Sequence, residues 1–292
     1  MLGMNRLPLA TRVQILQMLC EGSSMRAISR ITGTSINTVT KLLVDAGTVA
    51  SAFHDAHVRQ VTSTKRVQCD EIWSFCFAKK KNASPEMKAA GTAGDVWSWT
   101  ALDPDSKLMV TWLVGDRTAE CAEYFMRDLA MRVANRVQLT TDGFGAYPNA
   151  VLAEFRGKAD YAQLQKIYGD DAPTTPERRY SPAVCIGAKK YPVHGNPDPA
   201  HISTSYVERS NLTLRMGMKR FARLTNAHSK KVENHGHALA LYFAFYNWIR
   251  PHASLNGRTP AMAAGLADVA LTWAEFVKLM DRAEFEIGKK SN

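Results

Sequence analysis

The sequence predicts an α/β fold, a mixed β-sheet with flanking helices, preceded by an all-α helix-turn-helix domain. Before residue 48 the chain shows three short amphipathic helical patterns separated by glycine-containing turns. After residue 65 the patterns run strand, strand, strand, helix, strand, which is typical of a mixed sheet. The 292 residues are enough for two domains with a sizeable core in the larger one.

The N-terminal helices carry recognisable start signals. Residues 8–20 alternate apolar and polar side chains with helical spacing, and Pro8 stands at their start. Ser24 is placed to cap a second helix over 25–32. Ser35 is placed to cap a third helix, which we expect to end at Gly47. Residues 1–47 are therefore predicted to form the helix-turn-helix domain, with a polar linker over 48–64.

In a helix-turn-helix the start of the last helix enters the major groove of DNA. The side chains expected there are Ser35, Asn37, Thr38 and Lys41. A small helical bundle used for dimerisation is the alternative interpretation of the same pattern.

The second domain is predicted over 65–265. Residues 67–77, 95–102 and 108–114 are rich in Trp, Val and Thr and read as an antiparallel meander. Thr118 is placed to cap the helix that follows, and a fourth strand ends at Asp142. Residues 145–166 look helical, 169–202 look like an irregular insertion, and 233–249 form a strongly amphipathic helix. A helical tail is expected over 266–292.

The charge is strongly basic and unevenly distributed. The chain has 37 Lys and Arg against 27 Asp and Glu, a net charge of +10. Residues 1–66 hold 8 basic and 3 acidic side chains, and residues 205–258 hold 9 basic and 2 acidic ones. Two concentrated basic blocks indicate two contacts with a polyanion, and nucleic acid is the polyanion we expect.

Three acidic residues stand where structure alone explains them poorly. Asp70 lies inside an apolar strand, although aspartate is a poor strand former and is seldom buried without a partner. Asp142 ends another strand, where an Asp-Gly turn is a simpler explanation. Glu208 lies on a helix beside an apolar seam that contains Val207. Carboxylates on strand, strand and helix together point to a site for a hard divalent cation.

Basic side chains accompany Glu208. Arg215 and Lys219 fall near the same helical stripe as Glu208, about 100° from the apolar seam. Such cations are suited to contacting a phosphate backbone without reading its sequence. The expected backbone-binding side chains of this segment are Arg209, Arg215, Lys219, Arg220 and Arg223.

The five cysteines are odd in number and include no C-x-x-C pair, which argues against a disulfide framework and a zinc ribbon. The sequence shows no signal peptide and no apolar run long enough to cross a bilayer. We therefore expect a cytoplasmic, nucleoid-associated protein that does not contact membranes.

These residues resemble those of DDE transposases with an RNase H-like core, and more narrowly the insertion-sequence-one family of bacterial transposases. The resemblance rests on Cys69-Asp70-Glu71-Ile72-Trp73, on Thr141-Asp142-Gly143 and on Val207-Glu208-Arg209-Ser210-Asn211 with Arg215 beyond it. The segment Tyr246-Asn-Trp-Ile-Arg-Pro-His-Ala-Ser-Leu255 adds a further match. The resemblance covers about residues 10–265.

The resemblance implies a catalytic triad of Asp70, Asp142 and Glu208 that holds two Mg²⁺ or Mn²⁺ ions. It implies double-stranded DNA as partner, both the terminal inverted repeats of a transposon and the target. Water would free a 3′-OH at the transposon end, and that hydroxyl would then attack the target DNA. Synapsis of two ends implies a homodimer or higher oligomer. Secondary candidates for phosphate contact or carboxylate orientation are Asn211, Arg250 and His252.

Two features depart from the family pattern. The cysteines do not supply the N-terminal zinc finger that many members carry, and the 66 residues from Asp142 to Glu208 are a long spacing. Three alternatives stay open at this stage. They are a non-enzymatic helix-turn-helix regulator, a carboxylate-pair hydrolase such as a glycosidase, which works without metal, and a catalytically inactive transposase relative.

Overall fold

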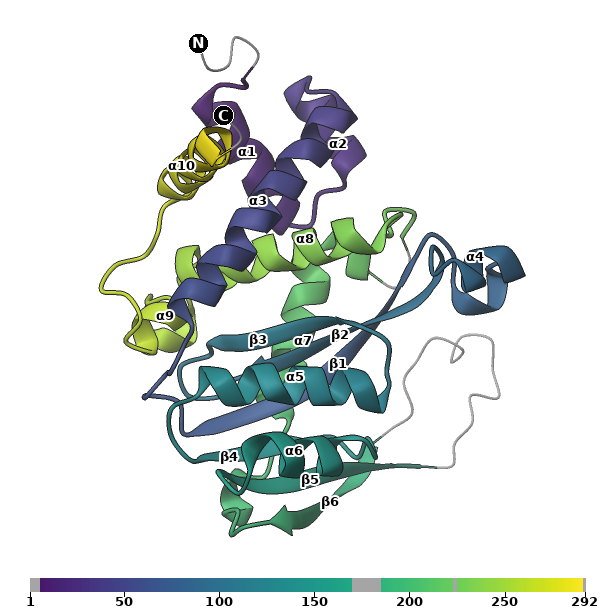
Figure 1. The fold of residues 1–292 in the computed structure, drawn as a ribbon, viewed down its shortest axis with the longest axis vertical. Coiled ribbons are helices and arrows are strands. Elements are labelled where there is room, and N and C mark those ends of the chain that lie inside the picture. Colours follow the sequence, from purple (N-terminus) through teal and green to yellow (C-terminus); the bar gives the residue numbers. More distant parts are fainter. Residues whose placement is uncertain (1–5, 170–184, 223–224, 291–292) are drawn as a thin grey trace.

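The computed structural model describes residues 6–169, 185–222 and 225–290. Its centre is a six-stranded sheet in the order β3-β2-β1-β4-β5-β6, with helices on both faces (Figure 1). The strands are β1 (Arg66–Cys76), β2 (Gly94–Leu102), β3 (Met109–Gly115), β4 (Val137–Thr141), β5 (Ala159–Tyr168) and β6 (Cys185–His194).

The strand directions make the sheet mixed. Strand β1 pairs antiparallel with β2 and parallel with β4. The pairs β2–β3 and β5–β6 are antiparallel, and β4–β5 is parallel. This order and these directions are consistent with an RNase H-like core, so the predicted α/β class with a mixed sheet and flanking helices is confirmed at that level.

The α-helices of the described residues are α1 (Leu9–Cys20), α2 (Met25–Thr32), α3 (Ile36–His57), α4 (Pro85–Ala89), α5 (Ala119–Arg132), α6 (Tyr147–Phe155), α7 (Ser205–Gly217), α8 (Val232–Ala244), α9 (Pro260–Ala263) and α10 (Trp273–Lys290). Some of them lie on the two faces of the sheet, whereas α1, α2 and α10 lie away from it (Figure 1). Helix α8 continues as a π-helical segment, Phe245–Ile249. Because side chains alternate along a strand, Cys69 of β1 joins the core under α5 and α6, whereas Ile72 joins the core with α7 and α8.

The first three helices have the predicted starts. Ser24 accepts a hydrogen bond from the Ala27 amide, and Ser35 accepts one from the Thr38 amide. These helices share one hydrophobic core with α7, α8 and α10. Arg12 of α1 also donates to Asp281 of α10 at 2.6 Å. The N-terminal helices are thus packed onto the helix that carries Glu208.

The third helix is longer than predicted. It continues past Gly47 to His57, so residues 48–57 of the expected linker are helical. Gly47 is buried, and a Cβ at this position would lie 2.5 Å from His237 of α8. The glycine therefore permits a close approach of α3 and α8 and does not end the helix.

The prediction for residues 145–166 was wrong in its second half. Helix α6 ends at Phe155, and both Arg156 and Gly157 have positive φ, which turns the chain. The next residues form β5 and pair with β4. Within the expected irregular insertion 169–202, residues 185–194 form β6, whereas residues 170–184 lie outside the described part.

In the described residues, no helix combines the length and the apolar character that crossing a membrane requires.

Candidate active site

Asp70 and Asp142 lie on neighbouring parallel strands. Gln68 of β1 pairs with Thr140 of β4. Each aspartate follows two positions later along its own strand direction, Asp70 within β1 and Asp142 immediately after β4. The parallel pairing therefore brings the two residues to the same level of the sheet.

Helix α7 is held at its start by the sheet and at its end by the segment that follows α1. The buried Gln68 accepts hydrogen bonds at its Oε1 from the amides of Tyr206 at 2.9 Å and Val207 at 3.2 Å. At the other end, the Gly22 amide donates to the Gly217 carbonyl at 2.7 Å. Two amides that a helix start leaves without a partner are thus satisfied by a strand side chain.

Asn211, one turn after Glu208, faces Asp70. Its side-chain amide donates to Asp70 Oδ2 at 2.8 Å. The Thr100 hydroxyl lies 3.0 Å from the Asp70 carbonyl and 3.2 Å from Asn211 Oδ1. Residues three apart share one face of a helix, so Glu208 stands on the same side of α7.

Asp142 and Glu208 both lie within electrostatic range of Asp70. Burial, and after it the negative charges of Glu71, Asp142 and Glu208, raise the pKa of Asp70 to about 7. Like charges that converge disfavour ionisation of the most buried member. A cation between them would relieve this repulsion.

Two of the three carboxylates are already paired with basic side chains. Asp142 accepts from the Phe144 amide at 2.9 Å and from Arg117 Nη2 at 3.2 Å. Glu208 accepts from the Thr204 hydroxyl at 2.6 Å and forms an ion pair with Lys166 of β5. Neither Arg117 nor Lys166 was predicted, because both arrive from other elements with no local sequence signal.

A fourth acidic residue, Glu71, belongs to the hydrogen-bond network of Asp142 through Arg117. Its side chain lies on the opposite face of β1 from Asp70. Its side chain is 1% exposed, and its Oε2 accepts from Arg117 Nε at 2.9 Å. Its Oε1 accepts from the buried hydroxyl of Tyr147. Burial and the charge of Asp142 raise the pKa of Glu71 to about 7, although the contacts with Tyr147 and Arg117 lower it. Arg117 therefore bridges Glu71 to Asp142.

The chemistry of the acids fits a hard divalent cation, since carboxylate oxygens are the ligands that Mg²⁺ and Mn²⁺ prefer. In the arrangement described, however, no three His, Cys, Asp or Glu side chains of residues 6–169, 185–222 and 225–290 come close enough to hold a metal ion.

The basic residues predicted near Glu208 have different environments. Arg209 and Lys219 are exposed, and Arg215 is half-buried on α7. Arg220 turns inward, where Nη1 donates to the Ser229 hydroxyl and to the Asn234 carbonyl at 3.0 Å each. Burial lowers the Arg220 pKa to about 10. Arg223 lies outside the described residues.

The secondary candidates of the C-terminal segment contact aromatic side chains. Arg250 lies 5.9 Å from the ring centroid of Phe245. The His252 ring packs edge-on against Tyr246, and its Nε2 lies 3.3 Å from the Tyr246 carbonyl. These contacts leave the predicted roles of Arg250 and His252 as predictions.

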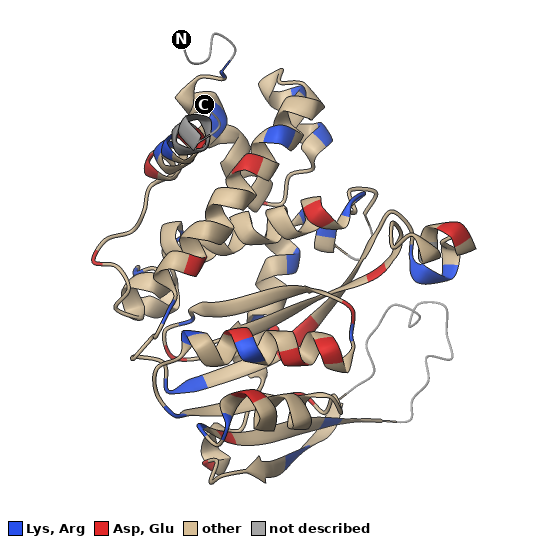
Figure 2. Cartoon of the chain, in the orientation of Figure 1, with Lys and Arg blue, Asp and Glu red and all other residues tan. Residues whose placement is uncertain are grey.

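The residues predicted to read DNA are exposed together at the start of α3. They are Ser35, Asn37, Thr38 and Lys41. Lys41 forms an ion pair with Asp45 at 2.6 Å. Basic residues also lie on the neighbouring α2 (Figure 2). The helix-turn-helix assignment and the role of these residues in DNA binding stay predictions.

The sheet is that of an α/β protein and is consistent with an RNase H-like core, and Asp142 and Glu208 lie near enough to Asp70 to raise its pKa. No family model and no curated protein matches the chain. Among solved structures it is similar to a Mos1 transposase paired-end complex with the left transposon end, at 11% identity and a TM-score of 0.24, over 55% of this chain and 59% of the other.

Two further Mos1 structures give similar values. The Mos1 strand transfer complex is 13% identical, with a TM-score of 0.24, over 55% of this chain and 58% of the other. The Mos1 mariner paired end complex with Mn is 12% identical, with a TM-score of 0.22, over 53% and 57%. The chain thus spans less than two thirds of each of these structures.

Proposed function

We propose that this protein is a DNA transposase that cleaves and joins DNA strands by metal-dependent phosphoryl transfer. The observation that carries the proposal is the placement of Asp70 and Asp142 at one level of two adjacent parallel strands, with Glu208 within electrostatic range of Asp70. This supports the interpretation of the three acids as one site. The sheet order supports the RNase H-like assignment.

Asp70, Asp142 and Glu208 are the residues that would hold Mg²⁺ or Mn²⁺, and two such ions would activate an attacking oxygen and stabilise the leaving 3′ oxygen. Asn211 would orient Asp70 through its amide, and Arg117 would orient Asp142. Because Lys166 is paired with Glu208, a cation that binds Glu208 has to compete with the Lys166 ammonium.

The DNA would contact two basic regions. We propose that Ser35, Asn37, Thr38 and Lys41 read the terminal inverted repeats from the start of α3. Arg209 and Lys219 would contact the phosphate backbone near the site of cleavage. Arg220 is left out of this surface because its guanidinium is bound internally. More specifically, we propose that the protein is the transposase of a bacterial insertion sequence and that it acts on DNA as a dimer or higher oligomer.

The proposal is tested with purified protein and duplexes that carry the DNA flanking this reading frame. Wild type is expected to nick the duplex in Mg²⁺ or Mn²⁺ and not in EDTA. Asp70→Asn, Asp142→Asn and Glu208→Gln are expected to lose cleavage while they keep binding. Asp268→Asn, at an exposed acid on the segment after α9, is the matched control and should cleave normally.

The alternatives give different results in the same assay. A helix-turn-helix regulator or an inactive relative binds the ends but never nicks them. A carboxylate-pair hydrolase stays active on its own polymer in EDTA. Full cleavage by purified Asp70→Asn would remove Asp70 from the proposed site.

A further inference from the structure

A row of aromatic side chains leads away from Asp142 along one face of the β1–β2 hairpin. We call Phe75, Trp73, Trp97 and Phe144 the aromatic row. Trp73 of β1 pairs directly with Trp97 of β2, so both point to the same face. Phe75 is two residues further along β1, and its ring centroid lies 5.8 Å from that of Trp73. All four side chains are partly exposed.

Two cations are interleaved with these rings. Lys79 Nζ lies 5.6 Å from the ring centroid of Trp73 and 5.7 Å from that of Phe75. The Arg117 guanidinium lies 5.2 Å from the centroid of Trp97 and 4.2 Å from that of Phe144. The same guanidinium reaches Asp142, so the row ends at this acid, on the face of β1 that carries Glu71 and not Asp70. Rings and positive charges therefore lie together from the hairpin to Asp142.

This combination suits an unpaired nucleic-acid strand. Bases stack on aromatic rings whatever their sequence, while neighbouring cations bind the phosphates. Same-face residues of a strand are about 6.7 Å apart, a spacing comparable with successive nucleotides of an extended single strand. A duplex keeps its bases stacked on one another and offers no free base face to the rings.

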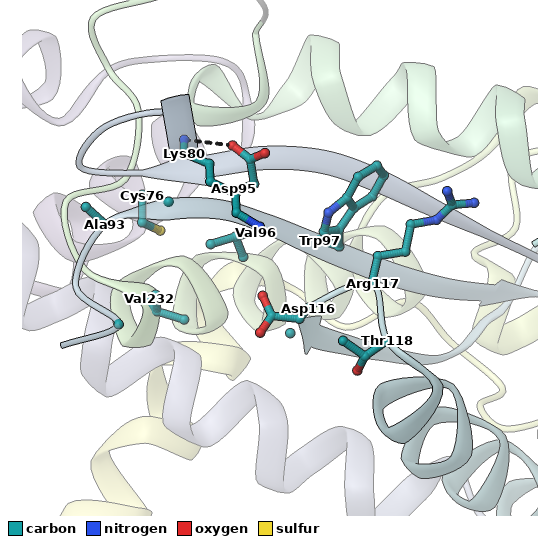
Figure 3. Close-up of a pocket in the computed structure, with 13 residues that line it drawn as sticks. Cys76, Lys80, Ala93, Asp95, Val96, Trp97, Asp116, Arg117, Thr118 and Val232 are labelled. Atoms are coloured by element: carbon teal, nitrogen blue, oxygen red, sulfur yellow. Dashed lines mark hydrogen bonds between the residues drawn. The ribbon is translucent and has the colours of Figure 1, made fainter. Parts of the chain in front are cut away.

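A pocket of about 600 Å³ adjoins the row at Trp97 (Figure 3). Its lining includes Lys80, Asp95, Asp116 and Arg117. Asp95 Oδ1 accepts a hydrogen bond from the Lys80 amide at 3.1 Å. The two aspartates would repel a phosphate but can accept hydrogen bonds from the amino groups of a base edge. The pocket is therefore better suited to a nucleobase than to the backbone.

We propose that the aromatic row and this pocket bind unpaired bases of a DNA strand beside Asp142, with bases stacked on the row and one base held against Trp97 in the pocket. The proposal rests on the proposed function for the choice of DNA as ligand. It requires no cleavage, so it is testable in the absence of metal.

The test is a fluorescence-anisotropy titration of a labelled single-stranded oligonucleotide of mixed sequence, and of its duplex, in EDTA. Trp73→Ala and Trp97→Ala are expected to weaken single-strand binding about fivefold or more each, because one base–ring stack contributes about 1–3 kcal/mol. Duplex binding should change much less. Trp73→Phe and Trp97→Phe keep a ring and should retain most of the affinity.

Tyr124→Ala is the matched control, because Tyr124 is 55% exposed on α5 and also carries a nearby cation, Arg127, at 5.6 Å. The Tyr124→Ala variant should bind the single strand with the affinity of wild type. Equal single-strand affinity in folded Trp73→Ala and Trp97→Ala would overturn the proposal. So would an equal loss of single-strand and duplex binding, or a change of oligomeric state without a change in DNA affinity, which would assign the face to a second copy of the chain.

The two proposals fail in different ways. If wild type never nicks DNA in Mg²⁺ or Mn²⁺ but the tryptophan variants lose single-strand binding, only the transposase proposal fails. If cleavage depends on Asp70 and Glu208 while the tryptophan variants bind single strands normally, only the base-binding proposal fails.

Discussion

Asn211 of α7 donates a hydrogen bond from its side-chain amide to Asp70 of β1 at 2.8 Å. On the same face of β1, Gln68 binds the first amides of α7. Two polar side chains of one strand face, spaced by the period of the strand, therefore set the position of the helix. These contacts hold α7 so that Glu208 lies within electrostatic range of Asp70.

Removal of the Asn211 amide should weaken the acid cluster without removing a ligand. Partners that orient a ligating carboxylate typically contribute 10- to 100-fold to metal affinity or activity. We expect Asn211→Ala to lower Mn²⁺ affinity about tenfold or more, as measured by calorimetric titration of the DNA-free protein. Leu212→Ala, on the exposed side of the same helix, is the control and should bind Mn²⁺ as wild type does. Unchanged affinity in Asn211→Ala would mean that Asp70 needs no orientation.

Replacement of Lys166 should have the opposite effect on metal binding. The Lys166 ammonium is paired with Glu208, and both side chains are about one third exposed. Such a partly solvated pair contributes up to about 1 kcal/mol. Lys166→Met should therefore strengthen Mn²⁺ binding by up to about fivefold in the same titration. Lys158→Met, at an exposed lysine just before β5, should leave it unchanged. Weaker binding in Lys166→Met would show that the lysine supports the site.

The elements that the sequence predicts correctly are those specified by local patterns. The meander of β1, β2 and β3 carries alternating apolar residues and a proline-containing turn, and Thr118 caps α5 as expected. Strand β5 was missed, and most of β6 was expected to be irregular, because their pairing joins residues whose contact leaves no periodic signal, such as Gln163 and Tyr191.

The residues of the candidate site also divide into those with a local sequence signal and those without one. Asp70 was singled out because an aspartate is unusual inside an apolar strand, and Asp142 and Glu208 because they complete the pattern of acids on strand, strand and helix. Their ligand role stays a prediction. Glu71 was not among the predicted ligands, and its side chain lies on the opposite face of β1 from Asp70. Arg117 and Lys166 come from elements whose position depends on the whole sheet, so the chain offers no local spacing that links either of them to an acid.

The Arg117–Glu71 contact predicts a specific dependence of stability on pH. Because the pKa of Glu71 in the folded protein is about 7 and exceeds its ordinary value, the folded state binds more protons than the unfolded state between these two values. Stability therefore falls as pH rises through this window. Without the guanidinium the Glu71 pKa rises further, so the window extends above pH 7. Arg117→Gln should thus lose more unfolding free energy at pH 8.5 than at pH 6, measured by urea denaturation.

The control for this prediction is a double-mutant cycle with Glu71→Gln. In the Glu71→Gln background, replacement of Arg117 should cost about the same free energy of unfolding at both pH values, since the Glu71 carboxylate is no longer there to ionise. A pH-independent effect of Arg117→Gln in the wild-type background would contradict the assignment of Glu71 as the titrating group.

The crossing of α3 over α8 gives a prediction that separates packing from helix propensity. Alanine is a better helix former than glycine by about 1 kcal/mol, so Gly47→Ala would stabilise an isolated helix. In the folded protein the added methyl would lie 2.5 Å from the backbone and Cβ of His237, and neither can move without shifting α8. Overpacking of this kind costs about 1–3 kcal/mol, so we expect Gly47→Ala to lower the unfolding free energy. Gly236→Ala, one residue from the crossing, meets nothing within 4 Å and should raise it. The midpoints of thermal denaturation of the two variants should therefore shift in opposite directions from wild type. If both variants were stabilised, α3 and α8 would not cross closely at Gly47. Residues 48–57 would then be free to act as the linker that their sequence suggests.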